Sequence, residues 1–398
     1  MLLNGEPFEN GSHVDFTSGQ QTFELVSEDE SNRRTFTLKF VRIPVLTSVK
    51  IGNTNLFEKP ADAEQNVGSA TTLTFKVLYN ADLSKVPVTF AYTQGAQMYL
   101  NGKAFSNGSQ VNFTSGSQSF ELRSSDGVVK KTYTINFERL PKPTYTLKMN
   151  FNNNYALSSN GKYYEWTETD SKLRDMLFGT VSKWGTTNLG YSIFRNGQQA
   201  NAYPVIPAGG GHESNCVRLK SLSNSTLGQM SNKRFTPGML FLGHEGAATS
   251  PQTVSPENFF MGVPFKAKPL SLSAYLKYTP GAQYKDKDGN VQAGVNDEPD
   301  FFCVVYKNTG GVQLTGADVL SHSSIVGFAR LSHPLHGVGS NWTKVSLDIQ
   351  YKSNLTSADF ASGQYSIVIC ASSSFNAMQY GGAEGSELYV DDVELEYE

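Results

Sequence analysis

The sequence predicts an all-β fold, in which small β-sandwich modules precede a larger two-sheet domain. Aromatic residues make up 12% of the 398 residues, and the abundant Tyr and Phe favour strands, whereas the frequent Gly and Asn favour turns. Charged residues make up only 17% of the chain, which fits a globular protein. Residues 270–278 alternate between apolar and polar side chains, as expected of a strand with one face in water.

Length and charge narrow the class of protein. At 398 residues the chain is too long for one ordinary domain, so we expect two or three. The net charge of −3 gives no reason to expect nucleic acid as a partner. No stretch is apolar and long enough to span a membrane, and residues 1–20 contain no hydrophobic signal core. Each of the three cysteines, Cys216, Cys303 and Cys370, lies in an apolar run, so we expect buried thiols.

A repeat organises the first third of the chain. Residues 3–44 recur almost without gaps at residues 100–141. Leu3-Asn4-Gly5 matches Leu100-Asn101-Gly102, and the Phe-Thr-Ser-Gly run that starts at Phe16 recurs at Phe113. This is the pattern of a duplicated module. Short strands, Asn-Gly turns and a period of about 100 residues give each module the size of an immunoglobulin-like sandwich.

The two copies of the module are unequal. Residues 45–97 supply a front half for the second copy, whereas the first copy has none. A half sandwich exposes an apolar face, so we expect that the chain begins inside a longer precursor, whose missing part holds an export signal and a lipid anchor. The alternative is that residues 1–44 form a small hairpin unit packed on the second module.

Domain boundaries follow from the repeat and from two prolines. Pro141-Lys142-Pro143 ends the second module, because these residues cannot continue a ladder of hydrogen bonds. We therefore predict three domains. They are 1–44, the C-terminal half of an immunoglobulin-like repeat; 45–142, an immunoglobulin-like sandwich; and 143–398, a larger carbohydrate-binding-like jelly roll.

The repeats resemble modules found in other proteins. Asp126-Gly127 and residues 131–135 (KTYTI) carry a resemblance to the cadherin-like or immunoglobulin-like modules at the front of many exported surface proteins of Gram-negative bacteria. Such modules usually act as spacers. The resemblance implies an exported protein, at the cell surface or outer membrane or in the periplasm.

The larger C-terminal domain shows many strands and long loops rich in Asn, Gly and Ser. This combination favours a two-sheet jelly roll. The expected strands lie at residues 145–151, 216–222, 270–278, 301–306, 344–349, 366–371 and 388–397. In the last strand, alternation places Tyr389, Asp391 and Val393 on the core side. Asp391 would then be a buried acid, which needs a cation or several hydrogen-bond donors.

A series of short motifs in this domain carries a family resemblance. In chain order they are residues 184–188 (WGTTN), 217–219 (VRL), 262–265 (GVPF), 278–281 (YTPG), 300–306 (DFFCVVY), 380–382 (YGG) and 388–395 (LYVDDVEL). Their order resembles the putative carbohydrate metabolism domain, found at the C-terminus of exported proteins of polysaccharide-using bacteria. The resemblance implies a jelly roll related to carbohydrate-binding modules and some glycoside hydrolases. Residues 150–154 (NFNNN) depart from the family pattern, which usually has an acid after the aromatic residue.

Two clusters of side chains fit a glycan site. Sugar rings stack their C–H faces on aromatic rings, and their hydroxyls need planar polar partners. Trp184 with Asn188 and Tyr191 forms one predicted ligand-binding cluster, and Gln379 with Tyr380 forms the other. The alternative for each ring is burial in the core, and burial is what we expect of Trp342, which begins a strand.

Asp391 and Asn152 form the candidate metal site. The family resemblance implies that the acid at Asp391 helps to hold a structural calcium ion, and Asn152 with backbone carbonyls would supply further oxygen ligands. The alternative is a carboxylate bonded to backbone N–H groups or to Arg218. His212-Glu213 offers no third metal ligand at a recognisable spacing.

Candidate catalytic residues are few. A glycosidase needs two carboxylates about 5–9 Å apart. Glu213 and Asp300 are the named candidates, with Glu245 and Asp391 as further members of a pair, and the sequence shows no two of them converging.

Three functional hypotheses remain. The first is a non-catalytic cell-surface protein, an outer membrane lipoprotein of a polysaccharide-utilisation system, whose jelly roll binds oligo- or polysaccharide through aromatic and polar loops. The second is a glycoside hydrolase with a carboxylate pair on the jelly roll. The third is an adhesin or structural surface protein with a protein partner. The first is preferred because the sequence shows no complete catalytic motif.

Overall fold

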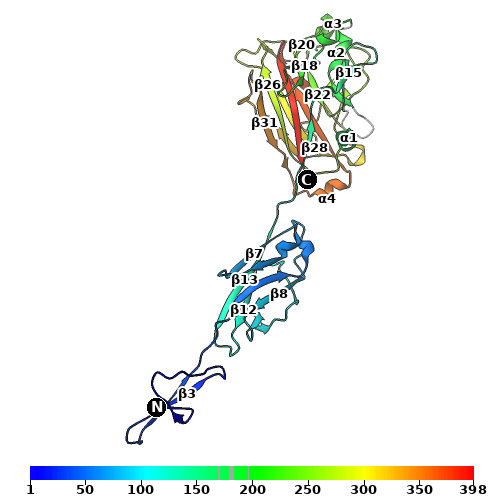
Figure 1. Cartoon of the computed structure of the whole chain (residues 1–398). Helices are drawn as coiled ribbons and strands as arrows, with labels where there is room; N and C mark the ends of the chain where they lie inside the picture. The colour runs from blue at the N-terminus through cyan, green and yellow to red at the C-terminus, as the bar shows by residue number, and fades with distance from the viewer. Residues whose placement is uncertain (169–170, 179–182, 196) are drawn as a thin grey trace. The chain divides into compact units, whose positions relative to one another are not determined.

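The computed structural model describes residues 1–168, 171–178, 183–195 and 197–398, and the chain forms two compact units, Met1–Lys142 and Pro143–Glu398 (Figure 1). Both units consist of mostly antiparallel sheets with few and short helices, so the all-β prediction is confirmed. Within the described residues, no helix has the length and apolar character needed to cross a membrane.

The first 44 residues form a single small sheet. In sheet order its strands are β2 (Glu6–Pro7), β1 (Leu2–Leu3), β3 (Gln21–Val26) and β4 (Arg33–Leu38). On one face of this sheet, Leu25 and Leu38 remain open to solvent, at 44% and 51% exposed. Their counterparts in the second copy of the repeat, Leu122 and Ile135, are 0% exposed. The difference arises because a second sheet covers the second copy.

The second module is a sandwich of two sheets. One sheet contains, in order, β10 (Lys103–Ala104), β9 (Gln97–Leu100), β12 (Gln118–Arg123), β13 (Lys130–Arg139) and β7 (Thr72–Val77). The other contains β11 (Gln110–Val111), β8 (Val86–Tyr92), β5 (Leu46–Ile51) and β6 (Glu64–Asn66), and the short 3-10 helices η1 (Thr54–Leu56) and η2 (Pro60–Ala63) connect β5 to β6. Fully buried side chains such as Val49 and Phe75 join the two sheets in one core.

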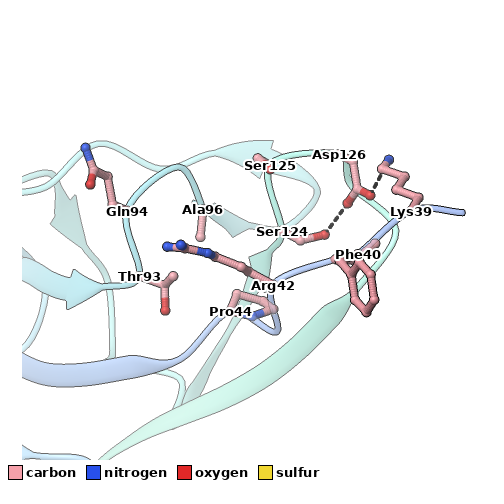
Figure 2. A pocket seen from close by; sticks show the side chains of 11 residues that line it. Lys39, Phe40, Arg42, Pro44, Thr93, Gln94, Ala96, Ser124, Ser125 and Asp126 are labelled. Carbon is pink, nitrogen blue, oxygen red and sulfur yellow. Dashed lines mark hydrogen bonds and ion pairs between the residues drawn. The ribbon is translucent and has the colours of Figure 1, made fainter. Parts of the chain in front are cut away.

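A polar joint links the two parts of the first unit. Residues 39–42 and Pro44 line a cavity of about 140 Å³ together with loops of the second module. Figure 2 shows the Lys39 side chain directed at Asp126, and Lys39 Nζ lies 2.6 Å from Asp126 Oδ2. Ser124 Oγ donates a hydrogen bond of 2.5 Å to Asp126 Oδ1. The contacts with Lys39 and Ser124 lower the pKa of Asp126, so this carboxylate stays ionised.

The second unit is a larger sandwich of two sheets, named the front sheet and the back sheet. The front sheet runs β18 (Val205–Gly209), β19 (Asn215–Lys220), β35 (Glu387–Tyr397), β26 (Pro269–Thr279) and β31 (Thr343–Asp348), and β14 (Tyr145–Met149) also pairs with β35. The back sheet runs β15 (Tyr155–Leu157), β16 (Tyr164–Thr167), β17 (Lys183–Thr186), β22 (Met239–Phe241), β33 (Tyr365–Ser372), β28 (Asp300–Lys307), β30 (Ile325–Arg330) and β32 (Gln350–Tyr351), and β25 (Val263–Pro264) pairs with β33.

Short elements complete this unit. Three small sheets pair β20 (Leu222–Ser223) with β21 (Phe235–Thr236), β23 (Gly243–Glu245) with β24 (Phe259–Met261) and β29 (Leu314–Thr315), and β27 (Tyr284–Lys285) with β34 (Gly382–Ala383). The helices are α1 (Ser171–Leu173), η3 (Arg174–Phe178), α2 (Asn188–Phe194), η4 (Ala200–Ala202), α3 (Thr226–Met230), η5 (Pro256–Asn258), η6 (Thr309–Gly311), α4 (Ser357–Ala361) and η7 (Ala377–Gln379).

The two large sheets differ in what covers their outer faces. The main core lies between them and includes Leu276 of β26 and Ile369 of β33. The back sheet is also covered outside, since β28 and β33 are buried on both faces and Val304 belongs to a second core with Met261 of the small sheet β23-β24-β29. In the front sheet, Tyr275 and other outward side chains are only half-buried. Its outer face, the side away from the core, therefore meets solvent.

A β-bulge in β35 changes the predicted side-chain alternation. The predicted strand at 388–397 is confirmed, but its ladder with β26 shifts beside Asp392, whose φ of +46° is left-handed. Val390 before the shift and Val393 after it are both buried. The prediction that Tyr389 and Asp391 share the core face with Val393 is therefore wrong, because the extra residue places the side chains that precede it on the opposite face.

Candidate functional site

The predicted cluster around Trp184 lies inside the protein. Trp184 is 7% exposed and packs against Phe151, with ring centroids 5.8 Å apart. Asn188 is fully buried, and its side chain bonds the backbone N–H and carbonyl of Val205 at 3.0 and 2.8 Å. Tyr191 is 5% exposed. These side chains hold α2 against the core and offer no ring to solvent, which matches the alternative of burial in the core.

The second predicted cluster is only partly at the surface. Gln379 is exposed, whereas Tyr380 is half-buried and its hydroxyl donates a hydrogen bond of 3.4 Å to the carbonyl of Val254. Burial raises the pKa of Tyr380. The ring borders an apolar cavity of only about 30 Å³. That volume is close to the share of one water molecule in the liquid, so a sugar ring does not fit there.

The outer face of the front sheet gathers the open polar and aromatic groups. The ring of His212, in the β18–β19 turn, lies flat on Tyr275 of β26, with centroids 3.5 Å apart and planes 13° apart. Beside this pair is a cavity of about 310 Å³. Its lining comes from four strands and two loops: Lys148, Asn150, Asn152, His212, Glu213, Tyr275, Lys344, Asp392 and Glu394. The cavity has the size of small-ligand pockets, which begin at about 300 Å³.

A second set of rings lies on the same face. Lys277 Nζ is 4.2 Å from the ring centroid of Tyr389 and 5.1 Å from that of Trp342. Trp342 is half-buried, and its Nε1 donates a hydrogen bond of 3.3 Å to the carbonyl of Gly210. The expectation that Trp342 belongs to the core is wrong, since it shares the outward side with Lys344, two residues further on.

Ion pairs fix several charges in and near this cavity. Glu394 Oε1 lies 2.8 Å from Lys148 Nζ, and Glu394 Oε2 lies 3.3 Å from Lys344 Nζ. The Lys148 contact, then that of Lys344, lowers the pKa of Glu394. Further along, Lys220 Nζ lies 2.6 Å from Glu387 Oε1. Each of these three lysines therefore contacts a carboxylate of β35, and Lys148 and Lys344 share one.

Asp391 and Asn152 stabilise the β18–β19 turn. Asp391 is 1% exposed, and its two carboxylate oxygens accept the backbone N–H groups of His212 and Asp392 at 2.8 and 2.9 Å. Burial, and then the charge of Asp392, raises the pKa of Asp391. Asn152 accepts the backbone N–H of Asn215 at 3.0 Å. These contacts match the alternative of an acid held by N–H groups, while calcium at this position stays a prediction.

A third ligand joins His212-Glu213 in the folded chain. His212, Glu213 and Asp392 place one ligand atom each within 4.8 Å of one another, and His212 Nδ1 lies 2.9 Å from Asp392 Oδ2. Such a set could hold a divalent ion. The sequence could not reveal it, because the two parts are 180 positions apart.

The two named catalytic candidates are not brought together. Glu213 lines the front-sheet cavity, whereas Asp300 begins β28 of the back sheet and is 3% exposed. Asp300 Oδ1 accepts from Arg330 Nε at 2.9 Å and Oδ2 accepts from Nη2 at 2.7 Å. His333 Nε2 lies 3.7 Å from Asp300 Oδ1, which is the distance of an ion pair and too long for a hydrogen bond. Asp300 is thus engaged in a structural ion pair.

Glu245 is a separate acid of the second unit. Its carboxylate lies against the start of α2, where a Cβ on Gly190 would come 3.0 Å from Oε1. Burial raises the pKa of Glu245 to about 8, and the backbone N–H groups of Gly190 and Leu189 oppose that shift. Glu245 does not line the front-sheet cavity.

Comparison with known proteins places this unit in a family. A family model described as "Putative carbohydrate metabolism domain" matches residues 150–396. The chain belongs to this family. The match includes most of the front sheet, with β19, β26, β31 and β35, so the family domain contains the cavity described above. A search of curated proteins finds no match.

Solved structures share the fold of this family member. A putative glycoside hydrolase from Bacteroides thetaiotaomicron has a TM-score of 0.56 at 22% identity, covering 89% of this chain and 97% of that one. One from Bacteroides vulgatus has a TM-score of 0.55 at 24% identity, covering 63% of this chain and 98% of that one. At these identities the likeness shows the fold alone. A carbohydrate-binding module solved with β-1,4-galactotriose also matches, covering 63% of this chain and 99% of that one, but its TM-score of 0.20 at 9% identity carries no argument.

Proposed function

We propose that this protein binds an oligo- or polysaccharide on the outer face of the front sheet. The observation that carries the proposal is a cavity of about 310 Å³ lined by Tyr275 with amides, carboxylates and lysines, together with the rings of Trp342 and Tyr389 on the same face. Rings supply the flat apolar surface that sugar C–H faces need, and the polar groups supply partners for hydroxyls.

The burial of the back sheet supports this choice of surface. Its central strands β28 and β33 are covered on both sides, so they offer no platform. The two loop clusters expected to bind sugar are buried or border a cavity of about 30 Å³. The face of β19, β35, β26 and β31 is where half-buried rings and an open cavity occur together.

The cellular setting belongs to the same proposal. We propose an exported protein at the cell surface or in the periplasm, a lipid-anchored member of a polysaccharide-utilisation system. In this setting, the first unit acts as a spacer, because its second module is an ordinary filled sandwich with a well-packed core. The third reading, an adhesin with a protein partner, would use the same exposed face.

One observation favours a hydrolase as the second candidate. Carboxylate oxygens of Glu213 and Asp392 lie within 4.8 Å of each other at the cavity. Retaining glycosidases hold their two carboxyl groups about 5–5.5 Å apart. Glu213 and Asp392 are therefore the candidate catalytic pair, in place of the combination of Glu213 and Asp300.

A glycan panel separates these functions. The full chain is incubated with immobilised and soluble polysaccharides, and both retention and new reducing ends are measured. Binding alone predicts retention without new ends, and about tenfold weaker retention by Trp342→Ala, which corresponds to about 1.4 kcal/mol. Tyr79→Ala, which removes a 40% exposed ring from the first unit, is the control and should bind normally.

Two other outcomes of the glycan panel would favour the second or the third function. New reducing ends that disappear in Glu213→Gln and in Asp392→Asn would establish the hydrolase. Retention of no glycan, with a folded protein, would refute the proposed function and favour a protein partner.

A further inference from the structure

One row of side chains crosses the outer face of the front sheet. Arg218 of β19 lies opposite Tyr389 of β35, and Lys277 of β26 lies opposite Tyr389 from the other side. Trp342, just before β31, follows next to Lys277. Neighbouring strands are about 4.8 Å apart, so the two cations flank the Tyr389 ring on the surface to which the proposed function assigns the glycan.

Neither cation of this row meets a carboxylate among the described residues. The Lys277 ammonium faces the rings of Tyr389 and Trp342, at 4.2 and 5.1 Å from their centroids. Arg218 Nε is buried and finds no hydrogen-bond partner in the described part of the chain. The nearest acid along β35, Asp391, gives its oxygens to backbone N–H groups instead.

The other lysines of the face differ from Lys277 in that each contacts a carboxylate. Lys148 and Lys344 share Glu394, and Lys220 bonds Glu387 at 2.6 Å. Within the described chain, Arg218 and Lys277 thus differ from these lysines in having no carboxylate contact. A buried guanidinium donor without a partner is unfavourable, and a bound acceptor would remove that cost.

We infer that the glycan bound on the outer face is acidic, and that one of its carboxylate or sulfate groups lies over Tyr389 between Arg218 and Lys277. This inference rests on the proposed function. The planar guanidinium of Arg218 suits an oxyanion, because its N–H groups match two oxygens at once. The ring of the same sugar, or of its neighbour in the polymer, then stacks on Trp342.

The test compares matched polymers on the full chain. Affinity electrophoresis uses polygalacturonate, the same polymer with its carboxyl groups reduced, a sulfated polymer and neutral dextran. We expect an acidic polymer to bind about tenfold or more tightly than the neutral ones, and binding to weaken as NaCl rises from about 50 to about 500 mM. Binding of the polyuronate alone, or of the sulfated polymer alone, identifies which oxyanion is bound.

Two single-charge variants sharpen the test. Lys277→Met keeps an aliphatic chain over the two rings but removes the charge, and should weaken acidic binding about tenfold. Lys220→Met removes one positive charge from the same face, but that charge is already paired with Glu387, so its binding should stay within about twofold of the wild type. Arg218→Met should resemble Lys277→Met, with thermal unfolding used to confirm that each variant is folded.

Failure of the inference differs from failure of the proposed function. Binding of the two neutral polymers as tightly as both acidic polymers, or equal losses in Lys277→Met and Lys220→Met, would overturn the acidic glycan while leaving glycan binding intact. No retention of any polymer would overturn both.

Discussion

Asp300→Asn tests directly whether the ion pair between Asp300 and Arg330 stabilises the second unit. Asp300 has a side chain only 4% exposed, and it holds the guanidinium of Arg330, which is 24% exposed. Asparagine preserves the shape but removes the charge, so Arg330 would remain largely buried without a counter-charge. Breaking one partner of a buried pair costs about 3–5 kcal/mol. Because Arg330 keeps some contact with water, we expect the lower end, about 3 kcal/mol.

The assay can be confined to the second unit. All three tryptophans, Trp166, Trp184 and Trp342, lie in residues 143–398, so urea unfolding followed by tryptophan fluorescence reports that unit. Asp348→Asn, which alters an exposed carboxylate on β31, is the control and should shift the free energy of unfolding by less than about 0.5 kcal/mol. Glycan retention by Asp300→Asn should be normal wherever the protein is folded.

Two results would refute this reasoning. An unchanged unfolding midpoint in Asp300→Asn would mean that the ion pair is not structural. Loss of a hydrolytic activity in a variant of normal stability would return Asp300 to the catalytic candidates.

Two further predictions concern the repeat and the pH dependence. Leu122→Ala should destabilise the second module by about 2–5 kcal/mol, because Leu122 is fully buried. Leu25→Ala, at the matching but exposed position of the first copy, should have almost no effect. Calorimetry of the full chain measures both variants, and similar shifts of the unfolding temperature would contradict this prediction. Interaction with Asp300, and then the hydrogen bond with Glu298, raises the pKa of His333 above its ordinary 6.5, against the effect of burial. A raised pKa in the folded state adds stability below about pH 6.5 that disappears as pH rises through the folded pKa, so the urea midpoint should fall from pH 6 to pH 8 more in the wild type than in His333→Gln. Equal falls would show that His333 is not the group responsible.

Much of the fold could be predicted from local patterns. The repeat is visible in the sequence, and alternation in residues 270–278 predicted β26 because one face of that strand is wet. The bulge beside Asp392 could not be predicted, since a one-residue shift shows only in the ladder with β26. That shift moved Tyr389 from the expected core side to the outer face.

The candidate site depended on which strands lie side by side. Arg218, Lys277, Trp342 and Tyr389 are far apart in the sequence, and no local spacing links them. Trp184 was a candidate for sugar stacking because its loop is rich in glycine, with burial as the alternative, and packing against Phe151 buries it. A usable signal was present in β26, where Tyr275 and Lys277 occupy the wet face of a clearly alternating strand.

The most direct measurement of the central claim is a tryptophan fluorescence titration with a retained glycan. Trp166 and Trp184 are 0% and 7% exposed, whereas Trp342 is half-buried on the outer face. Bound glycan should change the emission and shield it from acrylamide, and both effects should disappear in Trp342→Tyr. Binding without any change in emission, or a response that persists undiminished in Trp342→Tyr, would contradict it.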